Sequence, residues 1–236
     1  MKDKLIVALD FPTLQQAQAC VASCGEDVTY YKVGMELYYA AGNEMIAFLK
    51  AHRKKIFLDL KLQDIPNTVS RAVRVLTRLS VDMINVHAVG GLKMMQAARQ
   101  SVREEAQALG IAAPKLMAVT VLTSMDETEF GALNYRTSVA EQVVSLAKLA
   151  KEAGLDGVVA SAQEAKNIRQ ACGPDFLIVT PGVRPAGAAV QDQSRITTPA
   201  AAIQNGADYL VVGRPITQAS DPQVAARAIQ QEISNA

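Results

Sequence analysis

The sequence predicts an α/β protein of the (β/α)8 TIM-barrel class, with residues 1–236 forming a single domain. Short apolar segments rich in β-forming residues alternate with longer amphipathic segments, which is typical of a parallel β/α domain. Several of the short segments are apolar at successive positions, such as Leu-Ile-Val-Ala-Leu at residues 5–9. Strands of this kind are expected where helices cover the outside of a sheet and side chains fill its inside. No linker, low-complexity tract or shift of composition divides the chain.

The predicted strands and helices alternate in order along the chain. The strands are expected at Leu5–Leu9, Tyr30–Val33, Ile56–Leu60, Met83–His87, Lys115–Val121, Gly157–Ala160, Phe176–Thr180 and Tyr209–Val212. The helices are expected near residues 13–23, 36–51, 67–79, 91–108, 138–152, 162–171, 198–205 and 221–234. Thr13 and Ser138 are suitable N-caps, and Gly154 and Gly206 are suitable helix ends.

A doubly wound open sheet is the structural alternative to the barrel. That fold usually carries a glycine-rich loop after its first strand, whereas this sequence has Asp10-Phe-Pro-Thr13 there, so the closed barrel fits better. Two connections, 124–137 and 182–197, are long for a compact domain. Segments of that length are often functional lids, and a plain surface connection is the alternative for 182–197.

The composition argues against a nucleic acid or a membrane as a partner. Twenty-four Lys and Arg oppose 23 Asp and Glu, and Trp is absent, so neither general electrostatic attraction nor extensive stacking on bases is expected. No apolar run approaches the ~20 residues that cross a bilayer, and the N-terminus lacks the long apolar region of a signal peptide. The three cysteines are a sparse, odd set, which suggests a reducing compartment. We therefore expect a cytoplasmic protein.

Polar side chains gather at the predicted C-terminal ends of the strands, where barrels of this class carry their active sites. Charged groups at such positions lose solvation and need partners. Charges that converge from three neighbouring strands on one rim indicate a functional site more than an isolated structural ion pair. The residues at these ends are Asp10, Lys32, Asp59, Lys61, His87, Thr120, Thr123, Arg184 and Arg214, the last preceded by Gly213.

Lys61, which lies between Asp59 and Asp64, is the leading candidate for the catalytic centre. Because Asp59 and Lys61 are two residues apart, they point to the same side of a strand, into the barrel mouth. Asp64 lies just beyond the strand. Nearby carboxylates favour the ammonium form of a lysine, which suits a cation and proton donor more than a neutral Schiff-base amine. The intervening side chains are expected to point outward to the helices: Leu58, Leu60 and Leu62.

Two arginines predict a phosphate site at the loops after the last two strands. Arg184 follows the seventh predicted strand, and Arg214 follows the eighth, directly after Gly213. Barrel enzymes commonly bind phosphate with the loops after these two strands. An arginine adds bidentate, charge-assisted hydrogen bonds, and a glycine permits close approach of the backbone.

These motifs closely resemble the bacterial-type orotidine 5′-phosphate decarboxylase family. The resemblance extends over nearly the whole chain, from Val7-Ala-Leu-Asp10 to Gly213-Arg214. The Asp-x-Lys-x-x-Asp core alone also occurs in related barrels such as 3-keto-L-gulonate 6-phosphate decarboxylase and hexulose-phosphate synthase. The combination is far more specific: Asp59-x-Lys61-x-x-Asp64-Ile-Pro-Asn-Thr68, Pro181-Gly-Val-Arg184-Pro185, Asp192-Gln193 and Gly213-Arg214-Pro-Ile-Thr217.

The resemblance implies conversion of orotidine 5′-monophosphate to uridine 5′-monophosphate, the last step of pyrimidine nucleotide synthesis, without metal or cofactor. By similarity, Lys61 protonates C6 as carbon dioxide leaves, and Asp59 lies against the substrate carboxylate. Asp64 and Thr68 are expected to reach the active site of a partner subunit in a homodimer with shared sites. The remaining contacts that the resemblance implies are Asp10 and Lys32 to ribose hydroxyls, Thr123 to the pyrimidine edge, Gln193 to base and phosphate, and Arg184, Gly213 and Arg214 to phosphate.

The sequence differs from the family pattern at one position, and two alternative functions are considered. Gln63 stands where the family often has His or an aromatic residue, and its side chain should point away from the array. A sugar-phosphate lyase or decarboxylase that uses Mg²⁺ is the enzymatic alternative, with Glu36 as a conceivable additional ligand. A catalytically silent phosphate-binding scaffold is the other, although a scaffold does not need a desolvated lysine. The role of His87 is left open between a structural and an acid–base function.

Overall fold

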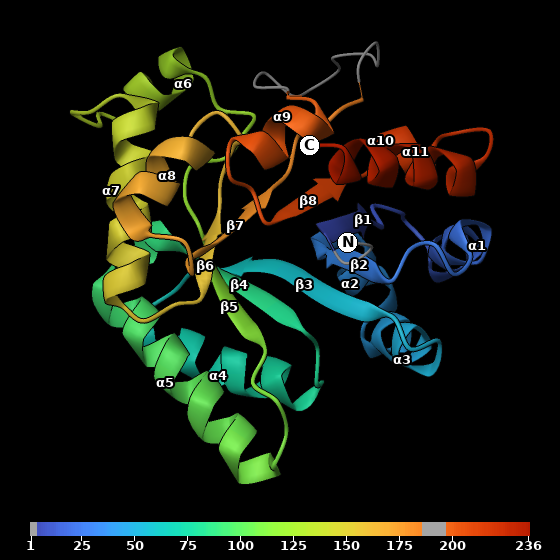
Figure 1. Ribbon diagram of the computed structural model, residues 1–236. Helices are drawn as coiled ribbons and strands as arrows, with labels where there is room; N and C mark the ends of the chain where they lie inside the picture. The colour runs from blue at the N-terminus through green and yellow to red at the C-terminus, as the bar shows by residue number, and fades with distance from the viewer. Residues whose placement is uncertain (1–3, 186–196) are drawn as a thin grey trace.

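The computed structural model describes residues 4–185 and 197–236 as a barrel of parallel strands surrounded by helices (Figure 1). Each strand pairs in parallel with the next one along the chain, and β8 returns to pair with β1, so the sheet is closed as the sequence predicts. The strands are β1 (Leu5–Ala8), β2 (Tyr30–Gly34), β3 (Lys55–Leu62), β4 (Met83–His87), β5 (Lys115–Val119), β6 (Gly157–Val159), β7 (Leu177–Thr180) and β8 (Tyr209–Val212).

Helices cover the outside of the barrel and follow the strands in order. They are α1 (Leu14–Cys24), α2 (Met35–Ala41), α3 (Asn43–Ala51), α4 (Pro66–Arg78), α5 (Leu92–Leu109), α6 (Glu127–Ala132), α7 (Val139–Glu152), α8 (Ala165–Cys172), α9 (Pro199–Gln204), α10 (Arg214–Thr217) and α11 (Pro222–Ser234). The predicted N-caps are confirmed: the Thr13 hydroxyl accepts from Gln16 N–H, and Ser138 forms a capping box with Glu141.

The helices differ from the prediction at three places, one of which is the short helix α10 after β8, which was not predicted. The single helix expected near 36–51 is divided into α2 and α3, because Gly42 adopts φ 54°, a left-handed conformation that ends α2. The long connection 124–137 contains the short helix α6, whose N-cap Asp126 accepts from two backbone N–H groups. In the connection 182–197, Val183 and Thr197, near its two ends, form a parallel β-bridge.

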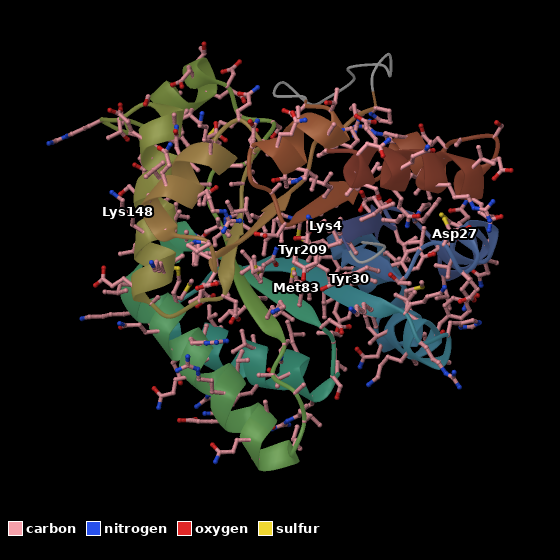
Figure 2. All side chains as sticks on the ribbon, viewed as in Figure 1. Lys4, Asp27, Tyr30, Met83, Lys148 and Tyr209 are labelled. Atoms are coloured by element: carbon pink, nitrogen blue, oxygen red, sulfur yellow. The ribbon has the colours of Figure 1, made fainter. Side chains whose placement is uncertain are left out.

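The core has two layers, one inside the barrel and one between the strands and the helices. Alternate strand residues point inward, as the period of two requires. Tyr30 and Tyr209, the first residues of β2 and β8, meet edge to face at a centroid distance of 6.0 Å toward the N-terminal end of the barrel, and Met83 belongs to the same cluster (Figure 2). Leu58 is buried in the outer layer, and Leu60 and Leu62 pack against that layer, as predicted. The fully inward-facing cluster is Ile6, Ala8, Tyr30, Phe57, Met83, Met117, Val179 and Val211.

The N-terminal end of the barrel is held by aspartates that bind backbone. Three aspartates that precede strands accept a hydrogen bond from the backbone N–H of the neighbouring strand, and two of these carboxylates also bind an arginine. Arg99 makes two parallel bonds of 2.9 Å to Asp156, and Arg169 binds Asp208 at 2.7 Å. The N–H donors and their acceptors are Ile56 with Asp82, Leu116 with Asp156, and Ile178 with Asp208.

Candidate active site

Four charged side chains form a continuous array at the C-terminal ends of β1, β2 and β3. Lys32 Nζ lies 2.9 Å from Asp10 Oδ1 and 3.4 Å from Asp59 Oδ2. The other oxygen of that carboxylate, Asp59 Oδ1, lies 2.7 Å from Lys61 Nζ. The signs alternate along the array, so each cation has an adjacent carboxylate. The structure thus brings together four of the residues that the sequence analysis selected.

Strand β3 is irregular where it carries Lys61. Its pairing with β4 shifts register between Leu58 and Leu62, and Lys61 adopts φ 51°. This left-handed conformation is uncommon for a residue with a side chain, and such strain concentrates at functional sites. The sequence predicted a regular strand at this point, so the irregularity is a correction.

Burial and charge act in opposite directions on the two central groups of the array. Burial alone would raise the pKa of Asp59, but Lys32 and Lys61, with hydrogen bonds from Lys61 and Asn85, hold that pKa below its ordinary value. Burial alone would lower the pKa of Lys32, but Asp59 and Asp10 together raise it. Both groups are therefore charged at neutral pH. For His87, burial lowers the pKa and Lys61 lowers it further, so the imidazole is neutral at pH 7.

The second aspartate of the motif lies apart from the array. Asp64 is exposed, and its carboxylate accepts a hydrogen bond of 2.7 Å from the Ile65 N–H. Within the described residues, the carboxylate that pairs with Lys61 is Asp59. Thr68, in the first turn of α4, is exposed as well, and so is Gln63.

The arginine side of the rim faces the same cavity. Arg184 is 6% exposed, and its Nη1 donates to the Val183 carbonyl. Arg214 is the first residue of α10, with Gly213 as the preceding N-cap. A Cβ at Gly213 would lie 3.6 Å from its nearest neighbour, the Cβ of Ala8, which is an ordinary contact distance. The surrounding protein therefore does not require a glycine at this position.

A single cavity of about 1000 Å³ joins both sides of the rim. Its volume is at the upper end of the range usual for small-molecule sites. Thr120 contributes to the strand end by bonding the Val159 carbonyl but does not line the cavity, and Gln193 lies outside the described residues. The sequence-predicted residues that line the cavity are Asp10, Lys32, Asp59, Lys61, Thr123, Arg184, Gly213 and Arg214.

Two supporting residues were missed by the sequence analysis. Asn85 on β4 is 1% exposed and bonds both Lys61 and Asp59. Strand parity could have found it, because it lies two residues after the inward-facing Met83. Gly34 ends β2, where a Cβ would lie 2.9 Å from Lys32 Nζ, so a side chain here would crowd the ion pair.

The described residues were also compared with the requirements of a metal site and of a membrane-spanning helix. Among residues 4–185 and 197–236, no group of three or more His, Cys, Asp and Glu side chains is placed to hold a metal ion. In the same ranges, no helix is long and apolar enough to cross a membrane.

The fold and the site define a class: a (β/α)8 barrel with a charged cavity at the C-terminal ends of its strands, the arrangement of TIM-barrel enzymes. Within that class, the chain belongs to the orotidine 5′-phosphate decarboxylase / HUMPS family, whose sequence profile matches residues 3–229.

Named relatives cover nearly the whole chain. An orotidine 5′-phosphate decarboxylase of Moorella thermoacetica is 54% identical over 233 residues, which are 98% of this chain and 92% of the relative. One of Streptococcus pneumoniae serotype 19F is 54% identical over 229 residues, 96% of this chain and 95% of the relative. The crystal structure of orotidine 5′-phosphate decarboxylase from Lactobacillus acidophilus has a TM-score of 0.86 and 44% identity, covering 97% of this chain and 98% of that one.

Proposed function

We propose that the protein decarboxylates orotidine 5′-monophosphate to uridine 5′-monophosphate, the last step of pyrimidine nucleotide synthesis. The observation that carries this proposal is the pairing of Lys61 Nζ with the buried Asp59 carboxylate at 2.7 Å, inside a cavity that Arg184 and Arg214 also line. Membership of the family and full-length similarity to named decarboxylases support the same reaction. Residues 1–236 act as one domain in this proposal.

The chemical difficulty of the reaction explains why a fixed ammonium group is needed. When the bond between C6 and the carboxylate carbon breaks, carbon dioxide leaves and its electron pair stays on C6. The pyrimidine ring delocalises this negative charge poorly. A preorganised cation stabilises the developing charge, and the same ammonium group then transfers a proton from Nζ to C6. The resulting neutral amine of Lys61 recovers a proton from water before the next turnover.

Asp59 has two roles in this mechanism. Its Oδ1 holds the Lys61 ammonium at 2.7 Å, which limits the positions from which the proton can be delivered. Its negative charge also lies close to where the substrate carboxylate is bound. Since like charges repel, that contact is relieved as carbon dioxide leaves, which is a form of ground-state destabilisation.

The rest of the cavity binds the nucleotide away from C6. In this proposal Asp10 and Lys32 bind the ribose hydroxyls, and Thr123 binds the pyrimidine edge. The phosphate is held by Arg184, Gly213, Arg214 and Gln193, the last from the connection 182–197. Binding energy from the phosphate lowers the barrier when it is used to exclude water and align C6 with Lys61.

The active form is proposed to be a homodimer with shared sites. Asp64 and Thr68 are exposed at the rim, next to Ile65, whose apolar side chain is 66% exposed. A partner subunit would cover this segment and receive Asp64 near its own Lys61. Sedimentation with and without uridine 5′-monophosphate tests this: a dimer stabilised by the nucleotide is expected, and a monomer that turns over substrate would rule out the shared site.

The reaction is proposed to need neither metal nor cofactor, and to take place in the cytoplasm without nucleic acid as a partner. The alternative is a Mg²⁺-dependent enzyme of the same family acting on a sugar phosphate, with Glu36 as a ligand. Glu36 is exposed at the start of α2, and does not line the cavity that contains Lys61. This placement favours the metal-free reaction.

One assay separates these functions. Purified protein is incubated with orotidine 5′-monophosphate in EDTA, and the loss of orotidylate absorbance is followed while uridylate is measured by chromatography. Uridylate formation at an unchanged rate in EDTA supports the proposal. A requirement for Mg²⁺, with turnover of a sugar phosphate instead, would establish the alternative enzyme, and no turnover of either substrate would favour a silent scaffold.

A further inference from the structure

Asn85 occupies a buried position inside the barrel that an apolar residue would ordinarily fill. It lies on β4, two residues after Met83, and therefore on the inward face of that strand. It is 1% exposed. An amide is costly to bury unless its donor and its acceptor are both satisfied.

Both polar atoms of the Asn85 side chain are used on the catalytic array. Oδ1 accepts a hydrogen bond of 2.8 Å from the backbone N–H of Lys61. Nδ2 donates a bond of 2.7 Å to Asp59 Oδ1. The orientation of the amide follows from these partners, because the reverse orientation would place a donor against the N–H and an acceptor against the carboxylate.

The position of Asn85 also coincides with the irregularity in β3. Leu58 pairs with Ile84, and Leu62 pairs with Val86, so residues 59–61 lie opposite Asn85 alone. The backbone of Lys61 leaves the regular strand conformation there, with φ 51°. Its N–H needs an acceptor at this point of the bulge, and the Asn85 side chain supplies it.

Asp59 Oδ1 therefore receives two donors at nearly equal distance. Lys61 Nζ lies 2.7 Å away, and Asn85 Nδ2 lies 2.7 Å away. Asn85 is thus bonded to the backbone of the proposed proton donor and to the carboxylate that holds its ammonium group. The Asn85 side chain therefore links the backbone of Lys61 to the carboxylate of Asp59.

We propose that Asn85 is a positioning residue for decarboxylation, which sets the relation between the Lys61 ammonium and the Asp59 carboxylate without contacting substrate. This inference rests on the proposed function. A purely structural asparagine would need only to satisfy its own amide. Here both bonds of the amide end on the two residues that carry the proposed chemistry.

Two substitutions at position 85 separate positioning from packing. Asn85→Leu keeps the branched shape and the number of side-chain heavy atoms but removes both hydrogen bonds, so the ammonium group is no longer held in a productive position. A displacement of about 1 Å near the reacting atoms costs about 100-fold in rate, and we expect a loss of kcat of about that size. The KM for orotidine 5′-monophosphate should change by less than about threefold, because the phosphate and ribose contacts are made elsewhere.

Asn85→Asp gives a pH signature that packing alone cannot produce. The introduced carboxyl group lies beside Asp59, and two carboxyl groups in contact share a proton over a wide pH range. While that proton is present, the new group donates to Asp59 Oδ1 and accepts from the Lys61 N–H, as the amide does. When the proton is lost at higher pH, the two carboxylates repel. The ratio of the kcat of Asn85→Asp to that of wild type should therefore rise as pH falls from 8 to 5, by about tenfold.

No rise of this kind is expected for Asn85→Leu. Without the Nδ2 donor, the pKa of Asp59 moves upward, so the ratio to wild type stays level or falls as pH decreases. The other charged or titratable side chains around Asp59 are the same in both variants and in wild type: Asp10 after β1, Lys32 on β2, Lys61 on β3 and His87 at the end of β4. The substrate phosphate also titrates in this pH range, and its effect cancels when the kcat of a variant is divided by that of wild type.

Asn205→Asp is the matched control. The Asn205 amide donates to the Ala162 carbonyl at 3.2 Å, away from the cavity lining, so the same chemical change there should leave the pH profile parallel to wild type. Thermal unfolding of every variant checks that it is folded at the assay temperature. If Asn85→Leu does not fold, Asn85→Ser replaces it, because a serine at this position is too short to reach both partners.

Hydrogen exchange of the Lys61 amide gives a readout that does not depend on turnover. The amide should be protected in wild type and in Asn85→Asp at pH 5, and should exchange faster in Asn85→Leu. If wild type forms no uridylate but this exchange pattern holds, the proposed function is wrong, while the hydrogen bond from the Lys61 N–H to Asn85 is confirmed. Three results would overturn the inference. These are equal protection of the Lys61 amide in wild type and Asn85→Leu, a kcat for Asn85→Leu near that of wild type, and a kcat ratio of Asn85→Asp to wild type that does not change with pH.

Discussion

The two ends of the barrel both carry carboxylates paired with cations, but they use them differently. At the N-terminal end, Asp156 binds Arg99 through two bonds and also accepts from a backbone N–H of the neighbouring strand. At the C-terminal end, Asp59 binds two lysines that line a cavity, and it also accepts from a buried amide. Carboxylates that bind backbone connect strands, whereas the Asp59 carboxylate holds lysine ammonium groups in position in the cavity. Stability and chemistry are therefore separated along the barrel axis.

The largest expected effect that tests this separation is at Lys61. Lys61→Ala removes both the cation and the proton donor, and we expect kcat/KM for orotidine 5′-monophosphate to fall by about 10⁵-fold. The unfolding midpoint should stay close to that of wild type, because Asp59 keeps Lys32 and Asn85 as partners. Loss of orotidylate absorbance measures the rate. Lys148→Ala, at an exposed position of α7, is the control and should retain full activity.

A smaller effect is expected at Arg214. Arg214→Ala should reduce kcat/KM by roughly 10- to 100-fold with orotidine 5′-monophosphate, the loss expected for one charge-assisted hydrogen bond. With orotidine, which has no phosphate, the loss should be close to nothing. Steady-state kinetics on both substrates measure the difference. Equal losses on the two substrates would show that Arg214 does not act through the phosphate.

At the opposite end of the barrel the same kind of substitution should change stability instead. Arg99→Leu leaves a partly buried Asp156 carboxylate without its cation, which should lower the free energy of unfolding by about 2–4 kcal/mol. The kcat/KM should be unchanged at temperatures where the variant is folded. Urea denaturation and the decarboxylation assay, carried out on one preparation, measure both. A catalytic defect in fully folded Arg99→Leu would contradict the separation.

The smallest expected effect is the pH dependence that Asp59 gives to stability. Its pKa is lower in the folded protein than in the unfolded chain, so its ionised form stabilises the fold above the unfolded value of about 4. That contribution is lost as pH falls through the lower, folded value. The stability difference between wild type and Asp59→Asn should therefore narrow as pH decreases from 5 toward 2. For Asp175→Asn, an exposed control, the difference should stay small throughout.

Much of this organisation could be predicted from residue patterns, and the exceptions have physical reasons. The period of two placed Asp59 and Lys61 on one face, and the alternation of apolar segments predicted the closed barrel. The bulge in β3 was missed, because Leu-Asp-Leu-Lys-Leu reads as a regular strand and the left-handed φ of Lys61 depends on a partner 24 residues away. For Asn85, strand parity gives the inward direction of the side chain, but its contacts with Asp59 and Lys61 lie across strands, and local sequence does not contain them.

The most direct test places the two ends of the barrel in one experiment. Uridylate formation from orotidine 5′-monophosphate and the unfolding midpoint are measured together for wild type, Lys61→Ala and Arg99→Leu. We predict that Lys61→Ala melts like wild type and forms no measurable uridylate, and that Arg99→Leu melts earlier and turns over substrate like wild type below its midpoint. Substantial uridylate formation by Lys61→Ala would contradict the account.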